Sequence, residues 1–233
     1  MSDLRSIVIG IVLMLRKYTC IDITVYAETS EGDYKNGIFA LPLIGFAVGF
    51  AAFLISLLKV FYDRFFVSVL ILSYYNIITK TINMRDTYTT FNYYIKPKNQ
   101  SDKLSGIIGI VLINLMYFSL FSIVPSSALI VMAVTGYSCL IIVSPIINRN
   151  KDNTTIIKYC GKYHVAAAFA ISFFIASIFN YKLVIPLSLT YILSIMAVSI
   201  LDEKIKLFPS SIEGTIIEIA QLLFLIITCL LKI

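Results

Sequence analysis

The sequence predicts an all-α fold: a polytopic membrane helix bundle with about seven transmembrane helices, in a single integral membrane domain that covers residues 1–233. Two observations predict this class. Hydrophobic residues make up 59 % of the chain and charged residues only 14 %, so a soluble fold would lack polar surface to present to water. The hydrophobic residues also gather in long runs that are separated by short polar connections.

The length of each apolar run is compared with the thickness of the membrane. A hydrocarbon layer of roughly 30 Å takes about 20 helical residues at about 1.5 Å each. The second and fifth runs are shorter, so we expect them to cross with little tilt or to extend into their polar flanks. The predicted spans are Gly37–Leu58, Phe65–Thr79, Leu104–Val124, Ala128–Ile147, Val165–Phe179, Leu183–Leu201 and Thr215–Leu231.

The distribution of Lys and Arg predicts the orientation. When these spans are threaded through a membrane, fifteen of the nineteen basic residues fall on one side. The positive-inside rule assigns that side to the cytoplasm. We therefore expect a multi-pass protein of the cell membrane, in contact with membrane lipid, whose N-terminus and polar loops are cytoplasmic.

The N-terminal apolar segment, residues 7–15, is too short to span, and no small-residue cleavage site follows it. Arg5 and Arg16 flank it, so both of its ends suit anionic headgroups. We interpret it as a short interfacial segment. An eighth full crossing is the alternative that the sequence leaves open.

Several classes of site are disfavoured. The basic residues are dispersed among loops that also carry most of the acidic residues, which argues against a nucleic-acid partner. The four cysteines lack the close pair spacings of zinc and redox motifs. The single histidine, His164, has no carboxylate or nucleophile near it in sequence, so we interpret it as an interfacial residue and not as a catalytic base.

The candidate functional carboxylates lie in or beside two of the predicted cytoplasmic connections. Asp86 and Thr87 follow the second span, and Asp102 precedes the third, so both carboxylates are expected at one membrane face. Asp86 is equally well explained as a solvated ion pair with Arg85. Glu218 lies inside the start of the last span, where a carboxylate is expected to face the bundle interior or a hydrated cavity, although an acid near a helix N-terminus is also favoured by the helix dipole.

Four stretches, taken in order, resemble the cobalamin synthase family, the adenosylcobinamide-GDP ribazoletransferases. Together with the loop between the first two, these stretches cover about a third of the chain. Leu41-Pro-Leu-Ile-Gly45, with Gly49, is similar to that family's Phe-Pro-Leu-Val-Gly element and its second glycine. Asp102, Gly106 and Gly109 resemble its Lys-Asp-Ser-Arg-x-Gly-x-x-Gly element. Ser144-Pro-Ile-Ile-Asn-Arg149 is similar to Ala-Pro-x-x-x-Arg, and Gly214-Thr-Ile-Ile-Glu218 to the end of Thr-Gly-Asp-x-x-Gly-Ala-x-x-Glu.

The chain departs from this family in its acidic residues. The family's His-x-Asp-Gly-x-x-Asp-Thr-x-Asp-Gly, aligned on Asp86-Thr87, places Lys80 at the histidine, Ile82 at the first aspartate and Thr89 at the third. Later in the chain, Ser211 falls at the aspartate of Thr-Gly-Asp, and Gln221 at a position where a second glutamate is usual.

The resemblance implies a transferase that joins α-ribazole, or its phosphate, to adenosylcobinamide-GDP and releases GMP, in the last steps of cobalamin biosynthesis. It implies Mg²⁺ as cofactor, and the nucleotide-activated corrinoid and α-ribazole as small-molecule partners. The residues that it implies are Asp86, Asp102 and Glu218 for catalysis, Asp86 and Asp102 for the metal, and Lys80, Thr87, Arg149, Gly106, Gly109 and Gly214 for substrate binding.

The missing acids leave two alternatives open. One is a catalytically degenerate relative that acts as a scaffold or partner, and the other is a small transporter component. The sequence also leaves open whether the chain forms a homo-oligomer.

Overall fold

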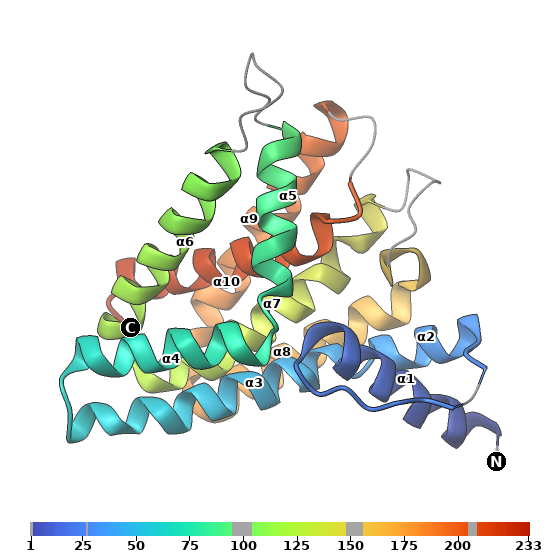
Figure 1. Ribbon diagram of the computed structural model, residues 1–233, viewed down its shortest axis with the longest axis horizontal. Coiled ribbons are helices and arrows are strands. Elements are labelled where there is room, and N and C mark those ends of the chain that lie inside the picture. The colour runs from blue at the N-terminus through green and yellow to red at the C-terminus, as the bar shows by residue number, and fades with distance from the viewer. Residues whose placement is uncertain (1, 27, 95–103, 148–155, 205–208) are drawn as a thin grey trace.

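A computed structural model describes residues 2–26, 28–94, 104–147, 156–204 and 209–233, and over these residues the regular structure is entirely helical (Figure 1). Short 3₁₀ turns lie at Leu57–Val60, Ile156–Tyr159 (η2) and Tyr181–Leu183. The α-helices are α1 (Ser2–Tyr18), α2 (Glu31–Ile38), α3 (Leu41–Ser56), α4 (Arg64–Ile78), α5 (Ile82–Tyr94), α6 (Leu104–Ile123), α7 (Ser126–Ile147), α8 (Lys162–Asn180), α9 (Val184–Lys204) and α10 (Ile212–Leu230).

The polytopic helical class is confirmed, and the structure revises the number of spans. Each predicted span contains a helix, namely α3, α4 and α6 to α10. Five helical stretches of the described chain are long and apolar enough to cross a membrane, or six if α4 and α5 count as one broken span. The count is lower than seven because α4 alone has only 15 residues, and because α8 and α9 belong to one 42-residue helical stretch. These apolar helices indicate a multi-pass membrane protein.

The predicted polar connection after the second span is largely a helix. Ile82–Tyr94 forms α5, which bends by 83° from α4. The turn is made at Lys80 and Thr81, whose φ angles of 50° and 53° lie in the left-handed region that non-glycine residues rarely adopt. Thr, Tyr and Asn are weak helix formers, so α5 depends on its packing against α6 and α10.

The N-terminal segment, expected to be a short interfacial segment at residues 7–15, is part of a longer helix. It belongs to the 17-residue helix α1, which packs on α2. Ser30 caps α2 by accepting a hydrogen bond from the Asp33 backbone N–H, and Asp33 accepts one from Ser6 of α1 at 2.6 Å. The Ser6 hydroxyl, followed by the backbone N–H of Ser30, holds the pKa of Asp33 below its usual range.

α7 is the centre of the bundle. Of the 18 residues in its most apolar segment, 89 % are buried inside the bundle. Helices α3, α8, α9 and α10 all contact α7. On α3, the pair Gly45 and Gly49 lies against the α7 backbone. A Cβ at Gly49 would come within 2.7 Å of the Leu129 carbonyl oxygen. Because lipid gives helices no hydrophobic reason to associate, close backbone approach of this kind is what holds them together.

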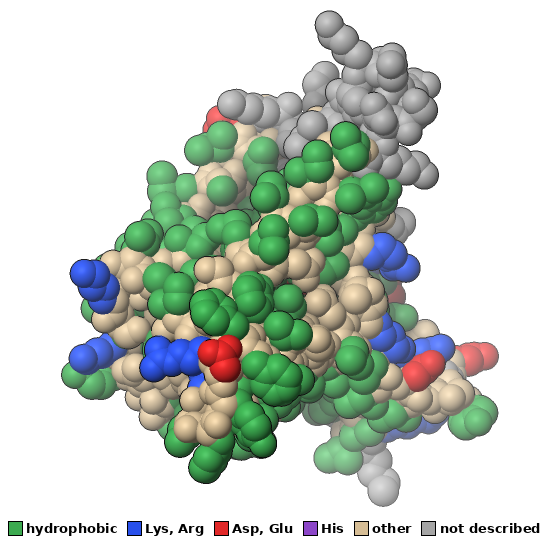
Figure 2. Space-filling view, turned by 60° about the vertical axis from the view of Figure 1, so that its left-hand side comes forward, with side chains coloured by type: hydrophobic (Ala, Val, Ile, Leu, Met, Phe, Trp, Pro, Cys, Tyr) green, Lys and Arg blue, Asp and Glu red, His purple; other side chains and the backbone are tan. Residues whose placement is uncertain are grey.

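The two ends of the molecule differ. In Figure 1 the turn between α3 and α4, the turn between α6 and α7 and the C-terminus lie at the lower left, whereas α1 and α2 lie at the opposite end. Figure 2 shows a face on which hydrophobic side chains are widespread and charged side chains gather toward the two sides. Exposed apolar residues such as Leu112 and Leu115 of α6 belong to a surface suited to lipid.

Replacing Gly49 by Ala tests the α3–α7 contact. The added methyl would meet backbone atoms at 2.7–2.8 Å that have no room to move, so we expect a loss of about 1–3 kcal/mol in unfolding free energy. The matched control is Gly32→Ala in α2, where a Cβ meets only Ser30 Oγ at 3.5 Å. Thermal unfolding followed by circular dichroism in detergent should lower the midpoint for Gly49→Ala alone. Equal midpoints for both variants would contradict the packing role.

Candidate functional site

The candidate site lies where the start of α10 crosses α5. Gly214, in the first turn of α10, is the point of contact: a Cβ there would lie 2.7 Å from Asp86 Cβ and 2.8 Å from Asn83 Cα. The absence of a side chain therefore lets the two helices touch, and it places the Asp86 carboxylate on the Gly214 backbone N–H. Two segments far apart in sequence meet at this point.

Glu213 adds a second carboxylate beside this contact. It is 3 % exposed, and it forms an ion pair with Lys17 of α1. It also accepts hydrogen bonds from the Tyr18 hydroxyl at 3.2 Å and from the Ile157 backbone N–H of η2 at 3.3 Å. A carboxylate buried to this degree needs such partners, because an unpaired buried charge is strongly destabilising. Glu213 therefore joins α1, η2 and α10.

The charges of this region act on one another. Asp86 is partly exposed and lies within electrostatic range of Arg85, Glu213 and Lys17. Burial, and then the neighbouring Glu213 carboxylate, raise the pKa of Tyr18 well above its ordinary value. The Tyr18 hydroxyl therefore stays protonated and donates a hydrogen bond to Glu213. The result is a cluster of two carboxylates and two basic groups at the end of the bundle.

Glu218 lies one turn deeper on α10 and is fully buried. The Tyr75 hydroxyl of α4 donates to it at 2.7 Å, and the Tyr117 hydroxyl of α6 donates at 2.8 Å. Gln221 belongs to the same cluster and accepts from Tyr75. This cluster ties α4, α6 and α10 together, and Glu218 does not line any of the three cavities that the described residues form beside α5. Its position fits a residue that supports the site from within better than one that touches a substrate.

Three hydroxyls extend the α5–α10 contact on its other side. Thr90 Oγ1 lies 2.9 Å from Ser211 Oγ, and the Thr215 hydroxyl donates to Thr90 at 2.9 Å. Ser211 is the residue that stands where the resemblance expected an aspartate. In this chain that position is neutral and its hydroxyl is used in helix packing.

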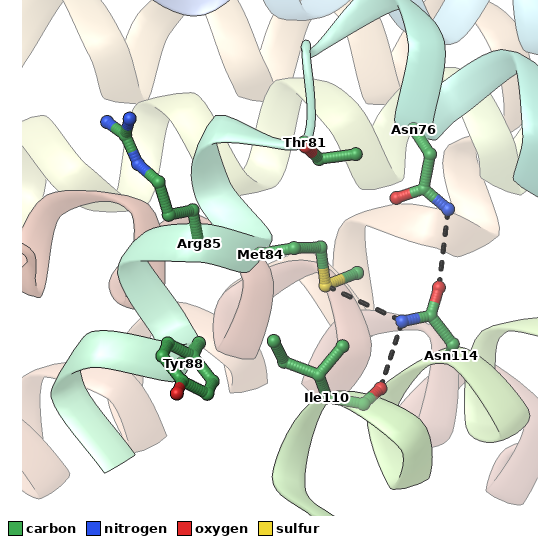
Figure 3. Close-up of a pocket in the computed structure, with 7 residues that line it drawn as sticks. All are labelled: Asn76, Thr81, Met84, Arg85, Tyr88, Ile110 and Asn114. Carbon is green, nitrogen blue, oxygen red and sulfur yellow. Dashed lines mark hydrogen bonds between the residues drawn. The ribbon is translucent and has the colours of Figure 1, made fainter. Parts of the chain in front are cut away.

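An open groove of about 500 Å³ borders the α4–α5 bend. Figure 3 shows Asn114 of α6 between Asn76 and Met84, with the Arg85 side chain pointing away from them. Asn76 donates to Asn114 at 3.3 Å, and Asn114 donates to the Ile110 carbonyl oxygen at 2.9 Å. The groove thus offers the side-chain amides of Asn76 and Asn114. It is lined by Asn76, Thr81, Met84, Arg85, Tyr88, Ile110 and Asn114.

The residues predicted for the site have different environments. Asp86 and Gly214 are brought together, and Lys80 is exposed at the bend. Thr87 is buried, and its hydroxyl donates to the Asn83 carbonyl oxygen at 2.8 Å. Gly106 and Gly109 lie against α5, where added Cβ atoms would meet Tyr88 and Phe91. Asp102 and Arg149 lie outside the described residues.

Lys17 and Tyr18 are the residues that sequence reasoning missed. In the sequence Lys17 only follows Arg16 at the end of the N-terminal apolar segment, and no local pattern points to a partner for it. The structure gives it Glu213, a residue almost at the other end of the chain. His164, expected at the interface, lies 2.9 Å from the Lys35 carbonyl oxygen and accepts from the Gly161 backbone N–H, so it connects α8 to α2.

The described residues have a limited capacity for metal binding. No group of three Asp, Glu, His or Cys side chains among them is close enough to hold an ion. Glu213 is already paired with Lys17, which leaves Asp86 as the accessible carboxylate. Mg²⁺ commonly takes only one or two protein carboxylates and completes its shell with water and substrate phosphates. The donor set therefore fits Mg²⁺ that arrives with a phosphorylated ligand, and not a metal held by protein alone.

Comparison with known proteins shows relatives of one kind. Over 241 aligned residues the chain is 24 % identical to an adenosylcobinamide-GDP ribazoletransferase from Alkaliphilus oremlandii, with 96 % of this chain and 98 % of the relative covered. It is 27 % identical over 158 residues to a protein of the same name from Clostridium botulinum, covering 63 % of this chain and 60 % of that one. No protein-family model and no solved structure matches the chain.

Removing Lys17 tests how α1 is held on α10. Lys17→Met leaves the buried Glu213 carboxylate without its counter-ion, so we expect a loss of about 1–3 kcal/mol in unfolding free energy. The double variant Lys17→Met/Glu213→Gln should regain part of that loss, because the uncompensated charge is then removed. The unfolding free energy of each variant is measured by titrating dodecyl sulfate into the detergent-solubilised protein.

The matched control for Lys17→Met is Arg16→Met, which breaks an exposed ion pair with Asp22 at 3.0 Å and should cost only about 0–1 kcal/mol. A Lys17→Met variant as stable as the Arg16→Met variant would show that the buried pair does not anchor α1.

Proposed function

Because the chain is a distant, near full-length homologue of adenosylcobinamide-GDP ribazoletransferase, we propose that it is a membrane transferase that joins α-ribazole, or its phosphate, to adenosylcobinamide-GDP and releases GMP. The observation that carries the proposal is the meeting of Asp86 with Gly214 and Glu213 at the α5–α10 crossing. Both sides of this crossing are segments that resemble elements of that family. A phosphate-bearing substrate needs cations and hydrogen-bond donors there, and Lys17 and Arg85 supply the cations.

The reaction is a substitution at phosphorus. The attacking oxygen of the α-ribazole moiety forms a bond to the cobinamide-side phosphorus, the bond from that phosphorus to the GMP oxygen breaks, and GMP leaves with the electron pair while the attacking hydroxyl loses its proton. Catalysis of such a step is mostly positioning and neutralisation of charge. Mg²⁺, when bound, would neutralise charge on the phosphate oxygens.

The residues of this chain then divide the work. Asp86, with Asp102 as predicted from the sequence, would hold the metal, and Lys80 and Arg149 would bind phosphate oxygens, as would Lys17. The Gly214 backbone N–H fixes the Asp86 carboxylate, and the buried Glu213 fixes the Lys17 ammonium. Glu218 keeps α4, α6 and α10 in register through its two tyrosine hydroxyls. Thr87, Gly106 and Gly109 shape α5 and its contact with α6.

We assign the site to the cytoplasmic side of the cell membrane, with the N-terminus on the same side. The excess of basic residues in the connections on one side supports this orientation. The arrangement in Figure 1 is compatible with it, because α1 and α2 lie away from the end that carries the α3–α4 turn. Nucleotide substrates are found in the cytoplasm.

A degenerate, non-catalytic relative is the second candidate. It is favoured by Lys80, Ile82 and Thr89, which stand where the resemblance expected a histidine and two aspartates. It is also favoured by the hydroxyl cluster at Ser211, which leaves that position without charge. A transporter is less well supported, because Glu218, the acid within the last span, is enclosed by helix packing.

GMP release tests the transferase. Detergent-purified protein with Mg²⁺, adenosylcobinamide-GDP and α-ribazole should release GMP, measured by liquid chromatography. Asp86→Asn should lower the rate by about 10–100-fold or more, because it removes a metal-holding charge while keeping the shape. The matched control is Asp63→Asn, which keeps the N-cap of α4 at the far end of the bundle and should leave the rate unchanged. Release by Asp86→Asn at the wild-type rate would refute the assignment.

Nucleotide binding separates the enzyme from the degenerate relative. Isothermal titration with GDP should give a tighter Kd with Mg²⁺ than with EDTA, and Lys17→Met should weaken the Mg²⁺-dependent binding by about tenfold, the loss of a single charge-assisted contact. Arg16→Met serves as the matched control and should bind like wild type. Binding that is absent, or indifferent to Mg²⁺, would favour the degenerate relative.

A further inference from the structure

A second, apolar cavity lies next to the candidate site. It measures about 360 Å³ and is formed by α5, α9 and α10, with Ile147 of α7 at its base. Its walls are almost entirely hydrocarbon, and Val198, Ile216 and Ala220 line it. Thr90 and Thr215 belong both to its wall and to the hydroxyl cluster of the α5–α10 contact. The cavity therefore adjoins the helix crossing that carries Asp86. It shares no lining residue with the groove of Figure 3.

The walls of the cavity include residues that face outward. Leu201 of α9 is 40 % exposed and Ile219 of α10 is 46 % exposed, although both line the cavity. Both helices belong to stretches that are long and apolar enough to cross a membrane, so we expect these exposed residues to face lipid. The opening thus faces acyl chains and not water. A gap left empty there would cost its lining the van der Waals contacts that hold membrane helices together.

One polar group interrupts this apolar wall. The Tyr94 hydroxyl, at the end of α5, is buried and has no hydrogen-bond partner among the described residues. Tyr94 also lines the cavity, at the same end of the bundle as Leu201 near the end of α9. A hydroxyl in an apolar environment needs an acceptor. Ends of spans lie at the depth of the ester carbonyls of phospholipids, whose oxygens are such acceptors.

We infer that the cavity between α5, α9 and α10 is a phospholipid-binding site, in which one acyl chain lies against Val198, Ile216 and Ala220 and an ester carbonyl oxygen accepts a hydrogen bond from the Tyr94 hydroxyl. The bound chain fills the space behind the Thr90–Ser211–Thr215 cluster and so supports the α5–α10 crossing. This assignment does not depend on the proposed transferase activity, because it rests on the cavity and the unpartnered hydroxyl alone.

Native mass spectrometry of the full chain tests the assignment. Delipidated protein is titrated with 1-palmitoyl-2-oleoyl-phosphatidylglycerol, and wild type should bind it saturably. Val198→Trp fills the cavity and should weaken binding by at least about tenfold. Ile200→Trp is the matched control, since it adds the same bulk to the exposed face of α9 outside the cavity, and it should bind like wild type.

Tyr94→Phe provides an arm that keeps the packing and removes only the hydroxyl. It should weaken lipid binding several-fold with an unchanged unfolding midpoint, which also covers the case in which Val198→Trp fails to fold. Equal lipid binding by wild type, Val198→Trp and Tyr94→Phe would overturn the site. Displacement of the lipid by α-ribazole would also overturn it, because the cavity would then belong to the acceptor nucleoside of the proposed reaction.

Discussion

Close approach of helix backbones at glycine is the constraint on which the rest of this structure depends. Gly49 brings α3 onto α7, Gly136 brings α7 onto α10 at Ile217 and Gln221, and Gly214 brings α10 onto α5. In lipid these contacts replace the hydrophobic effect as the reason for helices to associate. These contacts connect α3 to α7, α7 to α10 and α10 to α5, and so they position the helix that carries Glu213 and Glu218.

Once α10 is enclosed in this way, its carboxylates require partners, and the side-chain partners come from α1, α4 and α6. Glu213 forms an ion pair with Lys17 and accepts a hydrogen bond from Tyr18, both of α1. Glu218 accepts hydrogen bonds from the hydroxyls of Tyr75 and Tyr117. Each pairing satisfies a buried carboxyl group and also fixes a helix. The same bonds that stabilise the bundle therefore set the geometry around Asp86, so stability and any chemistry at this site are coupled.

Around Asp86 the chain differs in its charges from the family that it resembles. At the α5–α10 crossing a backbone N–H lies on the Asp86 carboxylate. Hydroxyls at Ser211, Thr90 and Thr215 occupy what the resemblance expected to be a more acidic surface. In the proposed reaction these hydroxyls would supply no charge to a metal and Lys17 would add a positive charge nearby, so substrate phosphates would contribute most of the metal's shell.

The sequence by itself determined the class of fold, the positions of the apolar helices and the family that the chain resembles, because these depend on runs of residue type and on local order along the chain. It predicted Asp86 and Gly214 as site residues but not that they touch, and it gave no sign that Lys17 pairs with Glu213. It also predicted a loop where α5 forms, since the propensity of that segment is weak and its helix exists only through packing on α6 and α10. Only the tertiary structure decided those points, because contacts between distant helices depend on how the bundle closes and not on any local pattern.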